Sequence, residues 1–220
     1  MVTAMGDELV LQVDGSRPVT AASVDAVQAL CDAAEDHTGP GIVTLHVSGV
    51  PEGDWTAGLA VGLVSKWERA VRRLERLGRL TVAVASGDVG GTALDVLLAA
   101  DLRIADPGTR LLVARDGEAT WPGMALYRLV QQAGTARVRR AALLGAPIGA
   151  GEALTLGLID ELAGDPPAAL AEIADQAAGL SGGELAIRRQ LMFEAAAIGF
   201  EDALGAHLAA CDRALRRAAH

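Results

Sequence analysis

The chain contains few aromatic residues and almost no lysine. Phenylalanine, tryptophan and tyrosine make up only 3% of its 220 residues, and Lys66 is the single lysine. Because aromatic side chains are scarce, the hydrophobic core must be built mainly from aliphatic residues. Hydrophobic residues make up 51% of the chain, which excludes a disordered protein, since such chains combine low hydrophobicity with high net charge.

Positive charge, long apolar runs and cysteine are also scarce. The net charge of −9 disfavours nucleic acid and anionic membranes as partners, because a basic surface supplies that attraction. No apolar run approaches the roughly 18 residues of a membrane helix, and residues 1–8 contain no basic leader, so neither a membrane span nor a signal peptide is predicted. Cys31 and Cys211 have no metal-ligand spacing, and we expect reduced core thiols in a cytoplasmic protein.

Strand and helix patterns alternate in the first half of the chain. Strands are predicted near 8–13, 42–47, 81–85, 102–105 and 111–113, and helices near 20–31, 57–77 and 92–100. From residue 122 onward only helices are predicted, with breaks at Gly134, Gly145, Gly157 and residues 166–167. This alternation predicts a parallel α/β core over residues 1–160 and an all-helical region over residues 161–220.

Three segments are candidates for chemistry, namely residues 55–58, 87–95 and 115–123. Each of the first two places unpaired backbone amides at the start of a predicted helix. Two such amides that converge on one point would form an oxyanion hole. The glycine-rich second segment lacks the Lys-Ser/Thr of a P-loop and the glycine spacing of a dinucleotide-binding fold, which argues against both of these phosphate-binding sites.

Several short motifs follow one another in a recognisable order. Residues 86–105 contain a strand, a glycine-rich turn, a helix and an acidic position, marked by Gly87, Gly91 and Asp101. The spacing then continues to Pro122-Gly123, Gly134, Gly145, Ala150, Ala153 and Gly157-Leu158-Ile159. Together these motifs resemble those of the crotonase family, the enoyl-CoA hydratases and isomerases, from about residue 8 to residue 218.

The resemblance implies a spiral of ββα turns with a C-terminal helical region that forms a homo-trimer or hexamer. It also implies an acyl-CoA thioester as substrate, with coenzyme A present only as part of that substrate and with no separate cofactor or metal. By position, the backbone amides of Ala57 and Thr92 would form the oxyanion hole. Gly91, Arg115 and Trp121 are the corresponding candidates for substrate binding.

The family's hydratases use two glutamates, and this chain departs from that pattern. The first position falls on Asp95, which keeps a carboxylate, whereas the second falls on Arg115, which cannot act as a base near neutral pH. Asp116 and Glu118 lie on the same loop, so Asp95 and Glu118 are the candidate catalytic residues. Structural interpretations remain open: residues 92–95 also fit a helix capping box, Arg115 could pair with Asp95, Asp116 or Glu118, and Glu118 fits a solvated loop acid.

Residues 64–69 and 120–128 resemble a small subgroup of actinomycete crotonases. Members of this subgroup act beside a type III polyketide synthase in making 3,5-dihydroxyphenylglycine, a building block of glycopeptide antibiotics. The resemblance implies a lyase of the enoyl-CoA hydratase type that works toward loss of water and aromatises a cyclised tetraketide thioester to 3,5-dihydroxyphenylacetyl-CoA. The alternatives are a catalytically weak partner that stimulates the synthase, which Arg115 favours, and an isomerase or thioesterase of the same fold.

Overall fold

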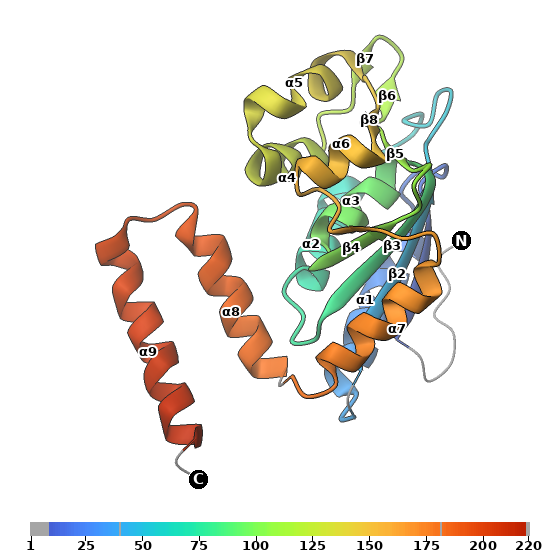
Figure 1. The fold of residues 1–220 in the computed structure, drawn as a ribbon. Helices are drawn as coiled ribbons and strands as arrows, with labels where there is room; N and C mark the ends of the chain where they lie inside the picture. The colour runs from blue at the N-terminus through green and yellow to red at the C-terminus, as the bar shows by residue number, and fades with distance from the viewer. Residues whose placement is uncertain (1–8, 40, 181, 219–220) are drawn as a thin grey trace.

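The computed structural model describes residues 9–39, 41–180 and 182–218, in which strands and helices alternate as far as residue 105 (Figure 1). The strands are β1 (Val10–Asp14), β2 (Val43–Gly49), β3 (Thr81–Val89), β4 (Leu102–Ala105), β5 (Arg110–Leu111), β6 (Arg115–Asp116), β7 (Ala119–Thr120), β8 (Ile148–Gly149) and β9 (Glu161–Leu162). The helices are α1 (Ala21–Asp36), α2 (Val61–Leu74), α3 (Gly91–Ala99), α4 (Met124–Ala133), α5 (Thr135–Leu144), α6 (Ala150–Thr155), α7 (Pro166–Ala177), α8 (Gly182–Ala195) and α9 (Phe200–Ala218). None of these helices is long and apolar enough to cross a membrane.

The main sheet has the order β1-β2-β3-β4-β9, and all of these neighbours are parallel. Strand β5 pairs in parallel with the end of β3 and antiparallel with β8, while β6 and β7 form a separate hairpin. Parallel neighbours need crossover connections, and α1, α2 and α3 supply them between the first four strands. The predicted α/β class with a parallel sheet is therefore confirmed.

Successive side chains of a strand point to opposite faces of the sheet, and this separates two hydrophobic cores. In β3, Ala83 and Ala85 belong to the larger core, which includes the buried faces of α1, α2 and α3. Val82 and Val84 point the other way, into a smaller core that contains Ala169 of α7. Figure 1 accordingly shows α1 and α7 on opposite faces of the sheet. The site described below lies on the side of the larger core.

The prediction of an all-helical chain from residue 122 onward is wrong at β8 and β9. Strand β9 pairs with β4, and α7 packs on the sheet through Ala169 and its neighbours, so the α/β core continues past the expected boundary at residue 160. Two-residue strands carry no periodic pattern, which is why the sequence did not reveal them. The first strand begins at Val10, and Glu8, where it was expected to begin, lies outside the described residues.

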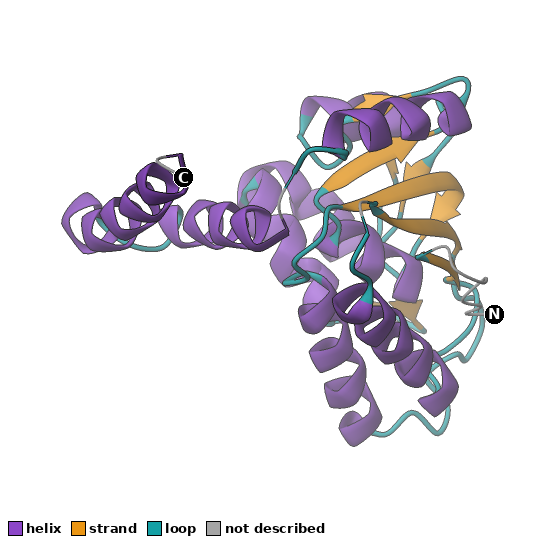
Figure 2. Ribbon diagram, turned by 90° about the horizontal axis from the view of Figure 1, so that it is seen from below, coloured by secondary structure: helices purple, strands orange, loops and turns teal. Residues whose placement is uncertain are grey.

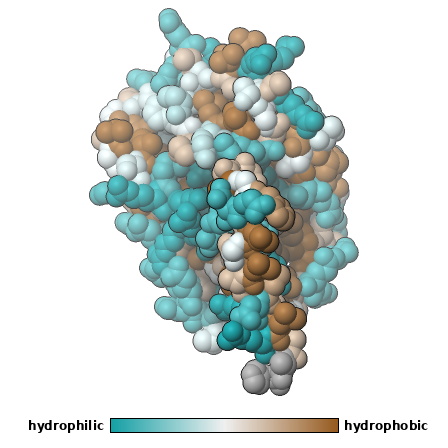
Figure 3. Space-filling model, turned by 90° about the vertical axis from the view of Figure 1, so that its left-hand side faces the viewer, coloured by the Kyte–Doolittle hydropathy of each residue, from teal (hydrophilic) through white to brown (hydrophobic). Residues whose placement is uncertain are grey.

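Helices α8 and α9 form an arm that projects from the rest of the molecule (Figures 1 and 2). None of the residues of α9 is buried in the single chain, and apolar atoms lie along the arm among hydrophilic ones (Figure 3). Cys211 is therefore exposed on α9, so the expectation of a core thiol is wrong there. Cys31 is buried in α1 as expected, and burial raises the pKa of its thiol to about 11.

Candidate active site

A small cavity of about 30 Å³ lies among α2, α3, the start of α4 and the preceding loops. This volume is enough for about one water molecule. Residues from all three candidate segments meet around it, although those segments are separated in sequence. The cavity is lined by Arg17, Val19, Pro51, Trp55, Leu59, Val64, Trp67, Glu68, Gly91, Thr92, Leu94, Asp95, Val113, Ala114, Trp121 and Ala125.

The start of α3 presents free backbone donors beside this cavity. Gly90 is the N-cap and its backbone is extended, so no side chain satisfies the first amides of the helix. Among the described residues, neither the amide of Gly91 nor that of Thr92 donates a hydrogen bond to another backbone group. Gly91 has φ of +52°, and a Cβ there would lie 3.0 Å from the carbonyl oxygen of Gly15, so this position requires glycine. These amides are placed to donate to a developing oxyanion.

The amide of Ala57 is not at a helix start, and the sequence prediction was wrong on this point. Helix α2 begins at Val61, and residues 55–58 form a turn. Within this turn the Ala57 amide donates to the carbonyl oxygen of Asp54 at 3.2 Å. The residue is exposed and does not line the cavity. A role in an oxyanion hole would require the turn to open.

Asp95 lies on the cavity side of α3 and is partly buried. The indole Nε1 of Trp67 donates to its Oδ2 at 2.9 Å. Burial, together with the negative charge of Glu68, raises the pKa of Asp95 to about 7. The carboxyl makes no bond to the start of α3, so the capping-box interpretation is wrong. A group with this pKa can both hold and release a proton near neutral pH.

An ion pair that lies at the same cavity as Asp95 was not predicted from the sequence. Arg128 of α4 contacts Glu68 of α2, with 3.2 Å between Nη1 and Oε2, and reaches Glu75 with 3.6 Å between Nε and Oε1. Burial raises the pKa of Glu68, and the nearby guanidinium of Arg128 opposes this shift. One signal was available: Glu68 lies four residues after Val64 and three before Val71, on the apolar stripe of its helix.

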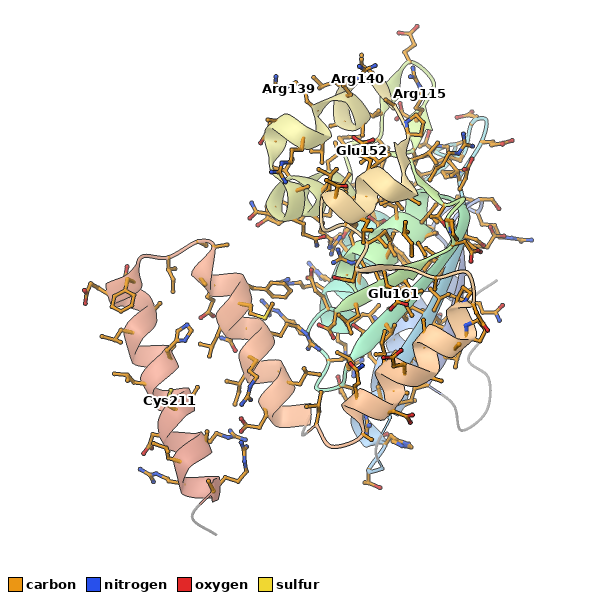
Figure 4. The ribbon with its side chains drawn as sticks, in the orientation of Figure 1. Arg115, Arg139, Arg140, Glu152, Glu161 and Cys211 are labelled. Atoms are coloured by element: carbon orange, nitrogen blue, oxygen red, sulfur yellow. The ribbon has the colours of Figure 1, made fainter. Side chains whose placement is uncertain are left out.

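Arg115 and Glu118 lie away from Asp95. Arg115 is exposed at the end of the molecule that carries Arg139 and Arg140 of α5 (Figure 4). Its Nη1 donates to the carbonyl oxygen of Leu144 at 3.2 Å, and its Nη2 donates to the carbonyl oxygen of Glu118 at 3.2 Å. The alternative interpretation, in which Arg115 pairs with the carboxylate of Asp95, Asp116 or Glu118, is therefore wrong. Glu118 is exposed in the β6–β7 turn, and neither residue lines the cavity.

Two tryptophan rings lie together at the cavity. The rings of Trp55 and Trp121 meet edge to face, with 5.1 Å between centroids and 69° between planes. The indole Nε1 of Trp55 also donates to the carbonyl oxygen of Arg115 at 2.6 Å, which fixes the ring. The cavity beside these rings, at about 30 Å³, is smaller than an acyl group, so it must widen before a substrate can enter.

Comparison with known proteins identifies the family of the chain. No family model matches the chain. A protein of Amycolatopsis orientalis described as an enoyl-CoA hydratase is 65% identical over 215 residues, which cover 98% of this chain and 99% of that protein. The chain belongs to the enoyl-CoA hydratase (crotonase) family.

Solved structures of enoyl-CoA hydratases and isomerases share its fold at low sequence identity. An enoyl-CoA hydratase/isomerase from Marinobacter aquaeolei has a TM-score of 0.80 at 16% identity, with 98% of this chain and 90% of that chain covered. An enoyl-CoA hydratase from Shewanella pealeana has a TM-score of 0.81 at 17% identity, with coverage of 98% and 87%. The crotonase fold is thus retained here.

Proposed function

We propose that this crotonase is a lyase of the enoyl-CoA hydratase type that removes water from an acyl thioester. One observation carries the proposal: Asp95, with a pKa of about 7, lines the same cavity as the free amides at the start of α3. An oxyanion donor and a group that exchanges protons near neutral pH are the two components that elimination beside a thioester requires.

The amide of Thr92 donates to the thioester oxygen, where negative charge develops as the enolate forms. The Cα–H bond breaks and its proton passes to a second carboxylate that lines the cavity. The Cβ–O bond breaks, the hydroxyl leaves as water with the proton of Asp95, and a carbon–carbon double bond forms. Trp121 bounds the space for the acyl group. Coenzyme A takes part only as the thiol portion of the substrate.

We further propose that the acyl group is a cyclised tetraketide, and that the product is 3,5-dihydroxyphenylacetyl-CoA, made on the way to dihydroxyphenylglycine in an antibiotic pathway. The support is that residues 64–69 and 120–128, which resemble the corresponding subgroup of crotonases, meet at Asp95. Loss of water that creates an aromatic ring is thermodynamically favourable. It therefore needs less assistance from acid–base catalysis than hydration of a simple enoyl thioester.

A second candidate is a catalytically weak partner that stimulates a type III polyketide synthase. The small volume of the cavity lined by Trp55 and Trp121, and the position of Arg115 outside that cavity, favour this candidate. Assays of the purified protein with the cyclised tetraketide thioester and with crotonyl-CoA separate the two. We expect release of 3,5-dihydroxyphenylacetyl-CoA without the synthase. Stimulation of the synthase that persists without any turnover by the isolated protein would contradict the lyase proposal.

We also propose that the arm joins subunits into a trimer or a hexamer. The apolar stripe of α9 is exposed in the single chain, and burying its leucines between subunits would stabilise an assembly by roughly 1.5–3 kcal/mol for each fully buried side chain. Its members are Phe200, Leu204, Leu208, Cys211 and Leu215.

Leu208→Glu is accordingly expected to dissociate the assembly. Leu208 is 58% exposed in the single chain, and a carboxylate at a buried subunit contact would lack a partner. Light scattering coupled to size-exclusion chromatography measures the resulting mass. Ala209→Glu, which places the same charge one residue further on a different side of α9, is the matched control and should leave the mass unchanged. Equal masses for the Leu208→Glu variant and the unaltered protein would contradict assembly through this stripe.

A further inference from the structure

We propose that Glu68 of α2 is the second acid–base residue of this site and shares a single proton with Asp95 of α3. This inference rests on the proposed lyase function. The resemblance puts the family's second glutamate at Arg115, which has no carboxyl, and Glu68 would provide the missing group. In the family pattern the second carboxyl follows β5 in sequence, whereas here it comes from a helix that precedes β3.

The two carboxyls lie beside the same cavity, and the residue that precedes Glu68 contacts Asp95. Glu68 and Asp95 both line the cavity, from different helices. Trp67, which precedes Glu68 in the chain, donates to Asp95 at 2.9 Å. The side chain of Glu68 is 19% exposed, compared with 6% for Arg128 and 8% for Glu75. Within this ionic cluster, Glu68 is therefore the more accessible partner of Arg128.

The charges around the pair leave one carboxyl without a cation. Three carboxyls, those of Asp95, Glu68 and Glu75, face two guanidiniums, since Arg128 contacts Glu68 and Glu75 while Arg72 pairs with Glu75. Arg17 also lines the cavity, but its side chain is 73% exposed and pairs with Asp14. The cluster is neutral only when it holds one proton, and a low-dielectric site penalises the extra negative charge.

The surroundings assign the starting position of that proton. Arg128 contacts Glu68 directly and favours its ionised form, while no guanidinium of the described residues pairs with Asp95, which keeps the proton. In the dehydration, the Glu68 carboxylate takes the proton from Cα and the Asp95 carboxylic acid protonates the leaving hydroxyl. Water departs and the double bond forms. The pair still holds one proton, now on Glu68, and transfer back to Asp95 restores the starting state.

Two measurements on Glu68→Gln test this assignment. The first follows the C2 protons of butyryl-CoA in D₂O by NMR, which reports removal of the Cα proton without loss of water. The second measures turnover of the tetraketide thioester as a function of pH. We expect exchange and turnover to fall by about 10²-fold or more. We also expect the apparent pKa of the pair to move to lower pH, because Asp95 loses a neighbouring negative charge. A Glu68 that acts only as a neighbouring charge would give the same pKa shift without loss of Cα exchange, so the exchange measurement separates the two roles.

The controls separate the possible failures. Glu172→Gln makes the same chemical change at an exposed site on α7 and should retain full exchange and turnover. Glu68→Asp keeps the carboxylate, should restore part of the activity, and replaces Glu68→Gln as the test if that variant does not fold. Normal exchange and turnover in a folded Glu68→Gln protein, or a loss confined to Glu118→Gln, would overturn the inference while leaving the lyase function intact. Absence of turnover and of acyl-CoA binding in the unaltered protein would overturn both.

Discussion

Asp95→Asn is expected to lower kcat for dehydration by about 10²–10⁴-fold, the range that a positioned general acid contributes. Asparagine keeps the shape of the side chain and can still accept the hydrogen bond from Trp67, but it cannot transfer a proton. Because Asp95 touches the acyl group rather than the coenzyme A portion in the proposed complex, KM should change much less than kcat.

Asp88→Asn is the matched control for this experiment. Asp88 lies in the same glycine-rich segment but does not line the cavity, and it pairs with Arg110 at the surface. Turnover by the control variant should equal that of the unaltered protein. If Asp95→Asn leaves kcat unchanged, or if both variants lose activity equally, Asp95 is not the acid of the reaction.

The same substitution should change how stability depends on pH. The pKa of Asp95 is about 7 in the folded protein, compared with 3.8 as its ordinary value, so the folded state keeps a proton that the unfolded chain releases. This contribution to stability is present in full below about pH 4 and is lost as the pH rises toward 7. The Asp95→Asn variant does not lose this stability with rising pH, because asparagine does not titrate. Relative to the unaltered protein, its free energy of unfolding should rise by up to about 1.4 kcal/mol per pH unit in that window, as measured by urea unfolding.

Much of the fold could be predicted because its elements carry strong local patterns. The helix predicted near 20–31 is confirmed as α1, which begins with a capping box between Thr20 and Ser23. The β-branched run at 42–47 became β2 for the same local reasons. The short strands β8 and β9 were missed because their residues are extended only through pairing with strands distant in sequence, which is a tertiary effect.

The candidate site was less predictable because it depends on which helix faces meet. The free amides at the start of α3 were found, since a glycine turn before a helix is a local feature. The expected place of Ala57 at a helix start was wrong because a turn of only four residues was read as the beginning of α2. Glu68 and Arg128 were overlooked because they are sixty residues apart, and only the packing of α2 against α4 makes them an ion pair.

Arg189→Met is expected to have the largest effect on stability. Arg189 of α8 is buried and pairs with both oxygens of Asp101, with 2.5 Å from Nε to Oδ1 and 2.6 Å from Nη2 to Oδ2. It also donates to the carbonyl oxygens of Leu77 and Arg79, and Asp101 in turn accepts from the amide of Thr81 at 2.9 Å. This network joins the arm to the ends of the sheet.

Loss of Arg189 would leave the Asp101 carboxylate without its cation, and the carbonyls of Leu77 and Arg79 without this donor. Removing one partner of a buried ion pair typically costs 3–5 kcal/mol, so we expect a decrease of about that size in the free energy of unfolding, measured in urea. Arg188→Met is the matched control: its side chain is 59% exposed and pairs with Glu184, so its cost should stay below about 1 kcal/mol. In the double variant Arg189→Met with Asp101→Asn, the decrease in the free energy of unfolding should be smaller than the sum of the two single decreases. The reason is that the second change removes the uncompensated charge. Equal losses at positions 188 and 189 would mean that this pair does not anchor α8 to the sheet.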